Sequence, residues 1–268
     1  MKPGLIAVDI DGTLIGTDLQ LADAVVLSFE RARSAGWRTV IATGRMFRSA
    51  LPWARRLGVT EPLITYQGAW VRDPVSFETL WHRVIPEPLA LQVIAAVKRH
   101  GLHLNLYRED ILMVERLTRE VGWYSAHSGI QPSVVPALEP HAGQATKLVA
   151  IAAPEILDAV APEFKAEFAS SLNVVRSNPR YLEFAHHEAS KGKALATLSG
   201  RMGIEPDRIV AFGDADNDAD MLELAGLGVC VGEASLQARQ AARRHTEPIG
   251  LGVAAVIDEL VGLRSGRA

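Results

Sequence analysis

The chain has 268 residues, of which 48% are apolar and 22% are charged, and its formal net charge is −3. This composition is typical of a globular protein with one large domain or two modest ones. A net charge this close to zero, with arginines scattered along the chain, argues against nucleic acid or an anionic membrane as the main partner.

Cysteine content and the N-terminal segment bear on the compartment. Cys230 is the only cysteine, so the chain cannot form an intrachain disulfide, and a reducing compartment is expected. The apolar neighbours of Cys230 favour a thiol packed in the core. The apolar run near the N-terminus is far too short for a signal peptide or a membrane-spanning helix. We therefore expect a cytoplasmic protein.

The first predicted strand ends in two acids and a glycine. Residues 5–8 form an apolar run, as expected for a strand buried on both faces of a parallel sheet. Asp9, Asp11 and Gly12 follow at once, and a hydrophobic core gives no reason for that change. Carboxylates at a strand end suit Mg²⁺, and one beside a metal can attack phosphorus. A solvated turn explains this motif alone equally well.

Predicted strands and helices then alternate. Residues 21–35 carry apolar side chains at helical spacing and end before Gly36, which is suited to close a helix. A strand over 39–42, a helix over 46–57 and a strand over 63–66 follow. This order predicts a parallel sheet with right-handed crossovers.

The pattern changes after residue 70 and becomes rich in strands. Residues 70–85 are predicted to form a hairpin, and a Pro-rich loop spans 131–140. Helices are expected over 86–100 and 155–168, and strands over 103–107, 111–114, 147–152, 172–176 and 181–185. These elements predict an inserted α/β domain, which we place at residues 83–185.

The alternation of helix and strand resumes at Ser190. Helices are expected over 191–202, 218–225, 236–244 and 253–261, and strands over 208–212 and 227–231. The predicted fold class is α/β. Residues 1–82 and 186–268 would form a doubly wound, Rossmann-like core with a parallel sheet, and residues 83–185 a smaller α/β cap.

A second group of acids follows a strand far along the chain. Asp214 and Asp218 come directly after the predicted strand 208–212. If that strand and the first belong to one parallel sheet, their carboxyl ends share an edge, where α/β folds bind ligands. Acids, a threonine and a helix N-terminus at one edge are what magnesium-assisted phosphoryl transfer requires. The spacing of these acids does not fit an EF-hand, and no dinucleotide-binding or P-loop glycine pattern occurs.

Four segments together resemble the haloacid dehalogenase-like (HAD) phosphatases, specifically the Cof-type subgroup with a large inserted α/β cap (type IIB). The first motif of the family resembles residues 9–13, Asp-Ile-Asp-Gly-Thr, and the second resembles residues 43–45, Thr-Gly-Arg. The third resembles residues 190–192, Ser-Lys-Gly, and the fourth resembles residues 213–221, which begin Gly-Asp-Ala-Asp-Asn-Asp. Their order, and the gap between the second and third, make the resemblance specific.

The resemblance implies a catalytic pair and a metal site. Asp9 would attack phosphorus to form an aspartyl-phosphate, and Asp11 would protonate the leaving oxygen and then activate water. Mg²⁺ would be bound by Asp9, the backbone carbonyl of Asp11 and Asp214, with Asp218 supporting the metal from behind these ligands. Four residues would bind the phosphoryl group: Thr43, Gly44, Lys191 and Asn217.

Several residues have a second interpretation. A lysine that opens a helix, as Lys191 does, is usually solvated and opposes the helix dipole, so its position is better explained by an anion opposite it. Residues 186–188, His-His-Glu, suit a metal cluster, but we favour a hinge or surface segment because adjacent side chains point apart in most backbones. Trp70, Trp81 and Trp123 are interpreted as packing residues in preference to substrate platforms.

Two positions depart from the pattern of the family. Gln67 stands where the family commonly has Asn after the tyrosine of the third strand, so we expect an altered contact there. The family's Asp-Gly-Val-Ala segment appears at residues 250–254 without its acid. Neither position belongs to the proposed catalytic residues.

The expected function is a magnesium-dependent phosphatase of small phosphorylated metabolites such as sugar phosphates, acting as a monomer or homodimer. A phosphomutase and a catalytically idle phosphoryl-binding protein are alternatives, and the intact set of acids with Lys191 disfavours the idle protein. We expect the cap to close over the site as a lid and to select the substrate. The sequence does not identify that substrate.

Overall fold

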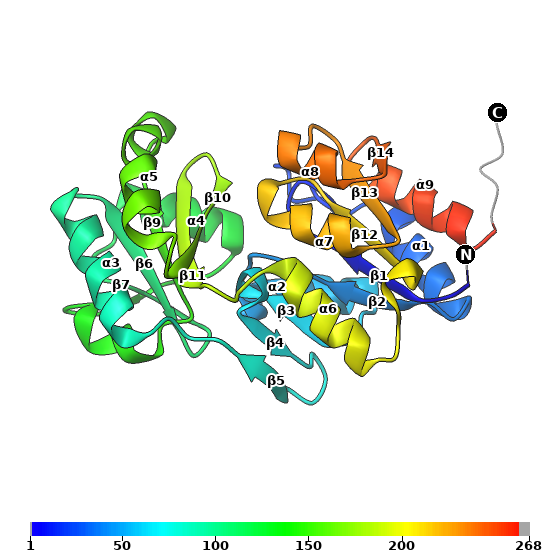
Figure 1. The fold of residues 1–268 in the computed structure, drawn as a ribbon, viewed down its shortest axis with the longest axis horizontal. Helices are drawn as coiled ribbons and strands as arrows, with labels where there is room; N and C mark the ends of the chain where they lie inside the picture. The colour runs from blue at the N-terminus through cyan, green and yellow to red at the C-terminus, as the bar shows by residue number, and fades with distance from the viewer. Residues whose placement is uncertain (1, 263–268) are drawn as a thin grey trace.

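The protein consists of two units that lie side by side, and the chain passes between them twice (Figure 1). The computed structural model describes residues 2–262. The larger unit holds both ends of the described chain, and the smaller unit comes from the middle of the sequence. Each unit is built around its own sheet.

The larger unit is centred on a five-stranded parallel sheet of order β14-β13-β12-β1-β2. Its strands are β1 (Leu5–Val8), β2 (Arg38–Ile41), β12 (Ile209–Gly213), β13 (Leu227–Val231) and β14 (Arg244–Thr246). Every residue of β1 is buried, because strands flank it on both sides and helices cover both faces. Leu5 pairs with Ile209, so the first strand lies beside a strand that follows the insert.

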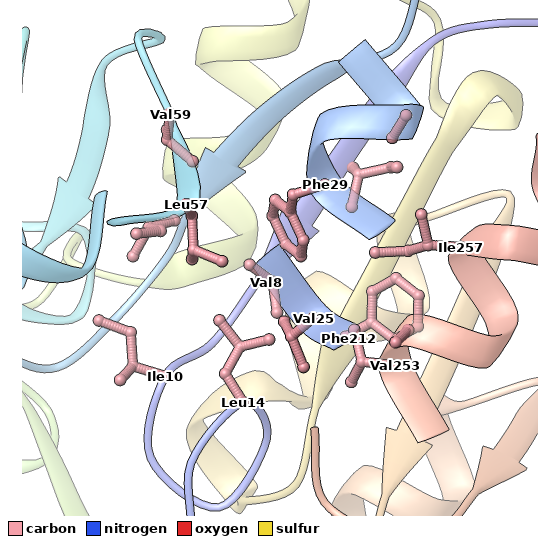
Figure 2. Packing of buried hydrophobic residues seen from close by; sticks show 14 of the residues in the cluster. Val8, Ile10, Leu14, Val25, Phe29, Leu57, Val59, Phe212, Val253 and Ile257 are labelled. Atoms are coloured by element: carbon pink, nitrogen blue, oxygen red, sulfur yellow. The ribbon is translucent and has the colours of Figure 1, made fainter. Parts of the chain in front are cut away.

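Helices cover both faces of this sheet, as a doubly wound fold requires. They are α1 (Asp23–Ser34), α2 (Phe47–Leu57), α6 (Lys191–Arg201), α7 (Ala219–Leu224), α8 (Leu236–Ala241) and α9 (Leu251–Leu260). Val8 and Phe212 pack with Phe29 of α1 and Ile257 of α9 (Figure 2). The alternate residues of β1 point to the other face and pack with Leu195 of α6. Burial of each such apolar side chain contributes about 1.5–3 kcal/mol to the stability of the fold. The parallel sheet with helices on both faces confirms the predicted α/β fold class.

The third strand of the chain departs from its predicted place. β3 (Leu63–Thr65) runs antiparallel to β4 (Trp70–Arg72), which pairs with β5 (Thr79–His82) in a separate three-stranded sheet. In the described part of the chain, a single bridge between Ala42 and Ile64 joins it to the parallel sheet. The reason is that β2 ends at Ile41 and gives way to the polar loop at Thr43, so no longer ladder can form.

The smaller unit contains a six-stranded sheet of order β10-β11-β9-β6-β7-β8. Its strands are β6 (His103–Arg108), β7 (Ile111–Val114), β8 (Ser133–Val134), β9 (Lys147–Ile151), β10 (Leu172–Asn178) and β11 (Tyr181–His186). The helices are α3 (Glu87–Arg99), α4 (Arg119–Ser128) and α5 (Pro154–Phe168). All neighbouring strands are antiparallel except β7 and β8.

The two faces of this sheet have different partners. Leu148 of β9 points to one face and packs with α3 and α5 through residues such as Val93 and Phe164. Val149 points to the other face and joins a cluster that includes Tyr66 of the larger unit. One face of the smaller sheet is therefore turned toward the larger unit.

Helix α4 and strands β8 and β14 were not predicted, and β8 lies in the segment predicted as a Pro-rich loop. Helix α4 begins after Thr118, whose hydroxyl accepts a hydrogen bond from the Val121 backbone, but Gly122 within it is a weak helix former. The sequence predicted a helix up to residue 244, whereas α8 ends at Ala241 and Arg244 begins β14. Pairing with β13 outweighs the helix propensity of these residues.

The two crossings between the units lie after β5 and after β11. The Arg83 guanidinium lies 3.1 Å from the Glu188 carboxylate, so an ion pair joins one crossing to the other. The rings of His186 and His187 lie 4.4 Å apart, closer than predicted for adjacent side chains. Among the side chains that the structure describes, the one group with the geometry of a metal site is the acidic cluster at the ends of β1 and β12, so the metal interpretation of residues 186–188 is not supported.

Two packing predictions concern Cys230 and the tryptophans. Cys230 is buried in β13, as predicted. Trp70 is also buried, with its ring 4.2 Å from that of His82. Trp123 is partly exposed and its ring lies beneath the Arg180 guanidinium, 4.2 Å away.

Candidate active site

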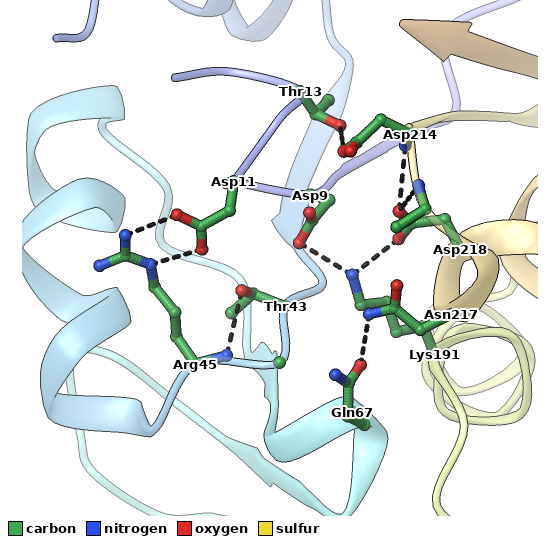
Figure 3. A network of polar contacts seen from close by, with 12 residues as sticks. Asp9, Asp11, Thr13, Thr43, Arg45, Gln67, Lys191, Asp214, Asn217 and Asp218 are labelled. Carbon is green, nitrogen blue, oxygen red and sulfur yellow. Dashed lines mark hydrogen bonds and ion pairs between the residues drawn. The ribbon is translucent and has the colours of Figure 1, made fainter. Parts of the chain in front are cut away.

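Asp9 and Lys191 form a buried ion pair at the carboxyl end of the parallel sheet. Asp9 follows β1 directly, and its backbone N–H donates to Phe212 of β12. Its Oδ1 lies 2.8 Å from Nζ of Lys191, which is the first residue of α6 (Figure 3). The Lys191 side chain is fully buried, so its solvated interpretation is wrong.

Asp218 holds both Lys191 and the loop that follows β12. One carboxylate oxygen lies 2.6 Å from Nζ of Lys191. The other accepts hydrogen bonds from the backbone N–H groups of Asp214 and Ala215, each 3.0 Å long. Burial alone would lower the pKa of Lys191, but the carboxylates of Asp218 and Asp9 outweigh it and raise that pKa. The two carboxylates therefore favour the charged form of Lys191 inside the site.

Asp214 lies at the end of β12 against the loop that follows β1. The Thr13 hydroxyl donates a 2.7 Å hydrogen bond to its Oδ1. Gly12 has a φ of +79°, and a Cβ there would lie 2.2 Å from the Asp214 carboxylate. A side chain at Gly12 would therefore displace Asp214 as well as strain the backbone.

Three carboxylates gather at this point. Asp9, Asp214 and Asp218 each offer an oxygen within 4.8 Å of the others. Burial, followed by repulsion from Asp218, raises the pKa of Asp214 to about 7. Burial also raises the pKa of Asp9 well above its usual value, although Lys191 opposes the shift. Crowded hard oxygens of this kind fit a divalent cation such as Mg²⁺, which would relieve their repulsion.

The Asp11 side chain points away from these three acids toward Arg45. The guanidinium donates two hydrogen bonds to it, from Nε at 2.7 Å and Nη2 at 2.6 Å (Figure 3). Arg45 also donates to the Ser49 hydroxyl, and its backbone N–H donates to the Thr43 hydroxyl. Arg45 belongs to the second sequence motif, but its contact with Asp11 was not predicted.

Gln67 links the two units. Its Oε1 accepts a 2.7 Å hydrogen bond from Asn217, and its Nε2 donates to Glu183 of β11 at 3.2 Å. Its backbone is in the left-handed region, with φ of +60°, and a Cβ at Gly44 would lie 2.4 Å from its amide nitrogen. Glycine at position 44 therefore leaves room for the longer amide that replaces the family's Asn.

A cavity of about 350 Å³ lies between the units and contains the residues predicted for the site. Six of them line it: Asp9, Asp11, Thr43, Gly44, Asp214 and Asn217. Lys191 and Asp218 lie directly behind Asp9. The smaller unit contributes residues that sequence reasoning missed: Tyr124, Ser128, Lys147, Asn178, Pro179, Tyr181 and Glu183. Only Lys147 and Glu183 gave a sequence signal, because each is a charge within an otherwise apolar strand.

The fold and the acidic site define a class of hydrolase. The family model of the haloacid dehalogenase-like hydrolases matches residues 6–257, so the chain belongs to this family. It is a phosphoric monoester hydrolase of the Cof type, as the four motifs predicted.

Named relatives match most of the chain. The 5-amino-6-(5-phospho-D-ribitylamino)uracil phosphatase YitU of Bacillus subtilis is 28% identical over 255 residues, which are 91% of this chain and 92% of YitU. The pyridoxal phosphate phosphatase YbhA of Escherichia coli is 28% identical over 243 residues, 87% of this chain and 89% of YbhA. The structure of the HAD subclass IIB sugar phosphatase BT4131 shares the fold, with a TM-score of 0.82, 21% identity, and coverage of 97% of this chain and 99% of that one.

No helix within residues 2–262 is both long enough and apolar enough to span a bilayer.

Proposed function

We propose that the chain is a Mg²⁺-dependent phosphatase that hydrolyses small phosphorylated metabolites through an aspartyl-phosphate on Asp9. The observation that carries the proposal is the Asp9 carboxylate at a strand end, 2.8 Å from buried Lys191 and within 4.8 Å of two further acids. A site that only binds phosphate has no need of a carboxylate placed to attack it. The relatives named as phosphatases of phosphorylated small molecules support the same class of substrate.

Asp9 and Asp11 divide the chemistry between them. A carboxylate oxygen of Asp9 attacks phosphorus, and the bond to the leaving oxygen breaks while Asp11 gives that oxygen a proton. Asp11 then takes a proton from water, which attacks phosphorus, releases inorganic phosphate and restores Asp9. Arg45 favours the ionised Asp11 that accepts this proton, so its contact with Asp11 must loosen before the next donation.

The surrounding residues bind the phosphoryl group and the metal. Thr43, the Gly44 backbone N–H, Lys191 and Asn217 would donate to phosphoryl oxygens. Mg²⁺ held by Asp9, the Asp11 carbonyl and Asp214 would offset the repulsion between carboxylate and phosphate. Both oxygens of Asp218 are already used by Lys191 and two backbone N–H groups, which favours a supporting role for it.

We assign the core to residues 1–82 and 186–268 and the cap to residues 83–185. The core supplies the acids, and the cap closes the cavity over them through Lys147, which donates a 2.8 Å hydrogen bond to the Gly44 carbonyl. Closure would exclude water until the leaving group departs.

Phosphate release from p-nitrophenyl phosphate tests the proposal. Release should require Mg²⁺ and stop when EDTA is added. Asp214→Asn should raise the Mg²⁺ concentration for half-maximal rate by about tenfold or more, because one charged ligand is lost. Asp216→Asn is the matched control, since Asp216 is exposed and lies two residues away. Full activity in EDTA would contradict the proposal. If release requires Mg²⁺, a panel of phosphorylated sugars, vitamins and nucleotides would rank the substrates.

A further inference from the structure

Each cation on the cavity wall is already paired with an acid of the same wall. Among the described residues that line the cavity, the cations are Arg45 and Lys147. Arg45 lies 2.6 Å from Asp11, and Lys147 lies 3.1 Å from Glu183. The same lining contains four acids: Asp9, Asp11, Asp214 and Glu183. Counted as formal charges, the wall has four negative and two positive side chains, and a bound divalent cation would balance the difference before any phosphoryl group binds.

The pair of Lys147 and Glu183 belongs to the cap and is buried. The strands β9 and β11 are antiparallel, with Lys147 opposite Ala185 and Val149 opposite Glu183, so the two charged side chains are diagonal neighbours on one face. Lys147 is 2% exposed and Glu183 is 5% exposed. Breaking a buried pair strands a charge where water cannot solvate it, so this pair resists any ligand that would compete for one partner.

Further contacts hold Lys147 in place. Its Nζ donates to the Gly44 carbonyl at 2.8 Å and lies 5.1 Å from the centre of the Tyr107 ring. Glu183 is held in turn by the amide of Gln67. Both members of the pair are thus fixed before a substrate arrives, and their charges cancel.

Of the five remaining cap residues on the wall, four are polar without charge and the fifth is Pro179. Ser128 and Asn178 offer a hydroxyl and an amide, and Tyr124 and Tyr181 lie edge to face with ring centres 5.7 Å apart. Such groups bind hydroxyls, carbonyls and flat faces of a ligand. None of these four would compensate a carboxylate or a second phosphate.

We propose that this site selects phosphate monoesters whose remainder is uncharged and rich in hydroxyls, as in sugar and polyol phosphates, and that the Lys147–Glu183 pair rejects substrates with a second anionic group. The inference rests on the proposed function. Of the described cap residues that line the cavity, Lys147 alone is positively charged. A second anion bound against them would draw Lys147 from Glu183 and leave that carboxylate buried without its cation.

Matched substrate pairs test the selection in the wild-type enzyme. Glucose 6-phosphate and 6-phosphogluconate differ at one end by a carboxylate, and fructose 6-phosphate and fructose 1,6-bisphosphate differ by a second phosphate. We expect kcat/KM to favour the member with one anionic group by at least about thirtyfold in both pairs, since the other member must displace a buried charge pair.

Glu183→Gln tests the role of the pair. The amide keeps the shape of the side chain but leaves the charge of Lys147 uncompensated, so the second anion of a substrate can bind Lys147. The ratio of kcat/KM between the two members of each substrate pair should therefore fall by at least about tenfold. The matched control is Glu167→Gln, which removes the same charge from the exposed side of the cap, where Glu167 lies 3.8 Å from Arg99. This control should leave the ratio unchanged.

Several outcomes would overturn the inference. Equal kcat/KM within both wild-type pairs would do so without any variant. An equal change for both members in Glu183→Gln would show that Lys147 acts on the phosphoryl group that they share. Hydrolysis of p-nitrophenyl phosphate without hydrolysis of glucose 6-phosphate or fructose 6-phosphate, whose sugar parts are uncharged, would also contradict the inference. Failure to hydrolyse p-nitrophenyl phosphate in the presence of Mg²⁺ would instead contradict the proposed function.

Discussion

The core wall and the cap wall of the cavity are built in different ways. On the core wall, Asp9 and Asp214 follow parallel strands directly, and Lys191 opens a helix, so the charges come from element ends. On the cap wall, Lys147 and Glu183 project from strands of an antiparallel sheet. The core wall has more acids than cations, with Arg45 paired to Asp11 and Lys191 facing the other acids, whereas the cap wall cancels its two charges in one pair.

From this difference we expect the core wall to carry out the reaction and the cap wall to select the substrate. Burial, together with repulsion between the acids of the core wall, raises the pKa of Asp9 and Asp214, and a group of acids of this kind fits a divalent cation. A neutral pair on the cap wall contributes no net charge and can only admit or reject the rest of the substrate. Changes to the core wall should therefore act on all substrates alike, and changes to the cap wall should act on some of them.

The largest expected effect is that of Asp9→Asn. The amide keeps the shape of the side chain but removes the nucleophile, so kcat should fall by at least about a thousandfold for every substrate. Phosphate release measures the loss, and circular dichroism should show an unchanged fold. Asp18→Asn is the control, because Asp18 is exposed in the same loop region. Turnover near the wild-type rate would exclude Asp9 as the nucleophile.

Lys191→Ala should have the next largest effect. Removal of one charged stabiliser of the phosphoryl transition state should lower kcat/KM by at least about a hundredfold. Asp218, which is fully buried, would lose its cation, so unfolding in urea should also become easier by about 3–5 kcal/mol. Lys193→Ala on the exposed side of the same helix is the control. A loss of activity below about threefold would remove Lys191 from the binding of the phosphoryl group.

Gln67→Asn tests the connection between the two walls. The shorter amide should not reach Asn217 and Glu183 together, and the loss of one hydrogen bond should lower kcat/KM by about three- to tenfold. The variant restores the residue that is common in the family, so the loss should come without unfolding. Gln92→Asn, at an exposed position of α3, serves as the control. An unchanged kcat/KM would mean that the link between the walls has no effect on catalysis.

The smallest effect concerns the cap alone. His103 is buried on β6 and hydrogen-bonded to Asn105, and burial lowers its pKa below the usual 6.5. Below pH 6.5 the unfolded chain binds a proton that the folded chain resists, so stability is present above that pH and falls as the solution becomes more acidic. Urea unfolding at pH 7 and pH 5 should show a smaller loss of stability in His103→Gln than in the wild type, and the remainder is expected because burial also lowers the pKa of His82 and His186.

An exposed histidine provides the comparison for that pH dependence. His187→Gln should leave the change in stability between pH 7 and pH 5 as in the wild type, because His187 lies on the surface. A loss of stability between pH 7 and pH 5 that is as large in His103→Gln as in the wild type would assign the whole pH dependence to other groups. The metal requirement of the core wall should be the same in both variants.

The core wall could be predicted from the sequence because its residues lie next to recognisable strands. The apolar run of β1 predicts where the chain meets the sheet edge, and the polar residues that follow predict the chemistry. Even there, the contact of Asp11 with Arg45 depends on side-chain directions that spacing does not give. The burial of Lys191 was supported only indirectly, by its unfavourable place at a helix start.

The cap wall was largely hidden from sequence reasoning. Tyr124 lies on α4, a helix that was not predicted because its sequence is rich in weak helix formers. Asn178 and Tyr181 belong to a hairpin whose orientation toward the core depends on how the two units pack. A charged residue in an apolar strand, as with Glu183, indicated that something unusual lies there but gave no partner.

The position of β1 between β2 and β12 has a consequence for biosynthesis. While the ribosome makes the chain, β1 can pair with β2 early, but its other edge waits until Ile209–Gly213 has emerged. The whole cap sheet lies between these two strands in the sequence and can therefore assemble first. The enzyme is thus expected to gain its selective wall before its reactive one, and a chain released before Ile209 would carry a folded cap without a catalytic centre.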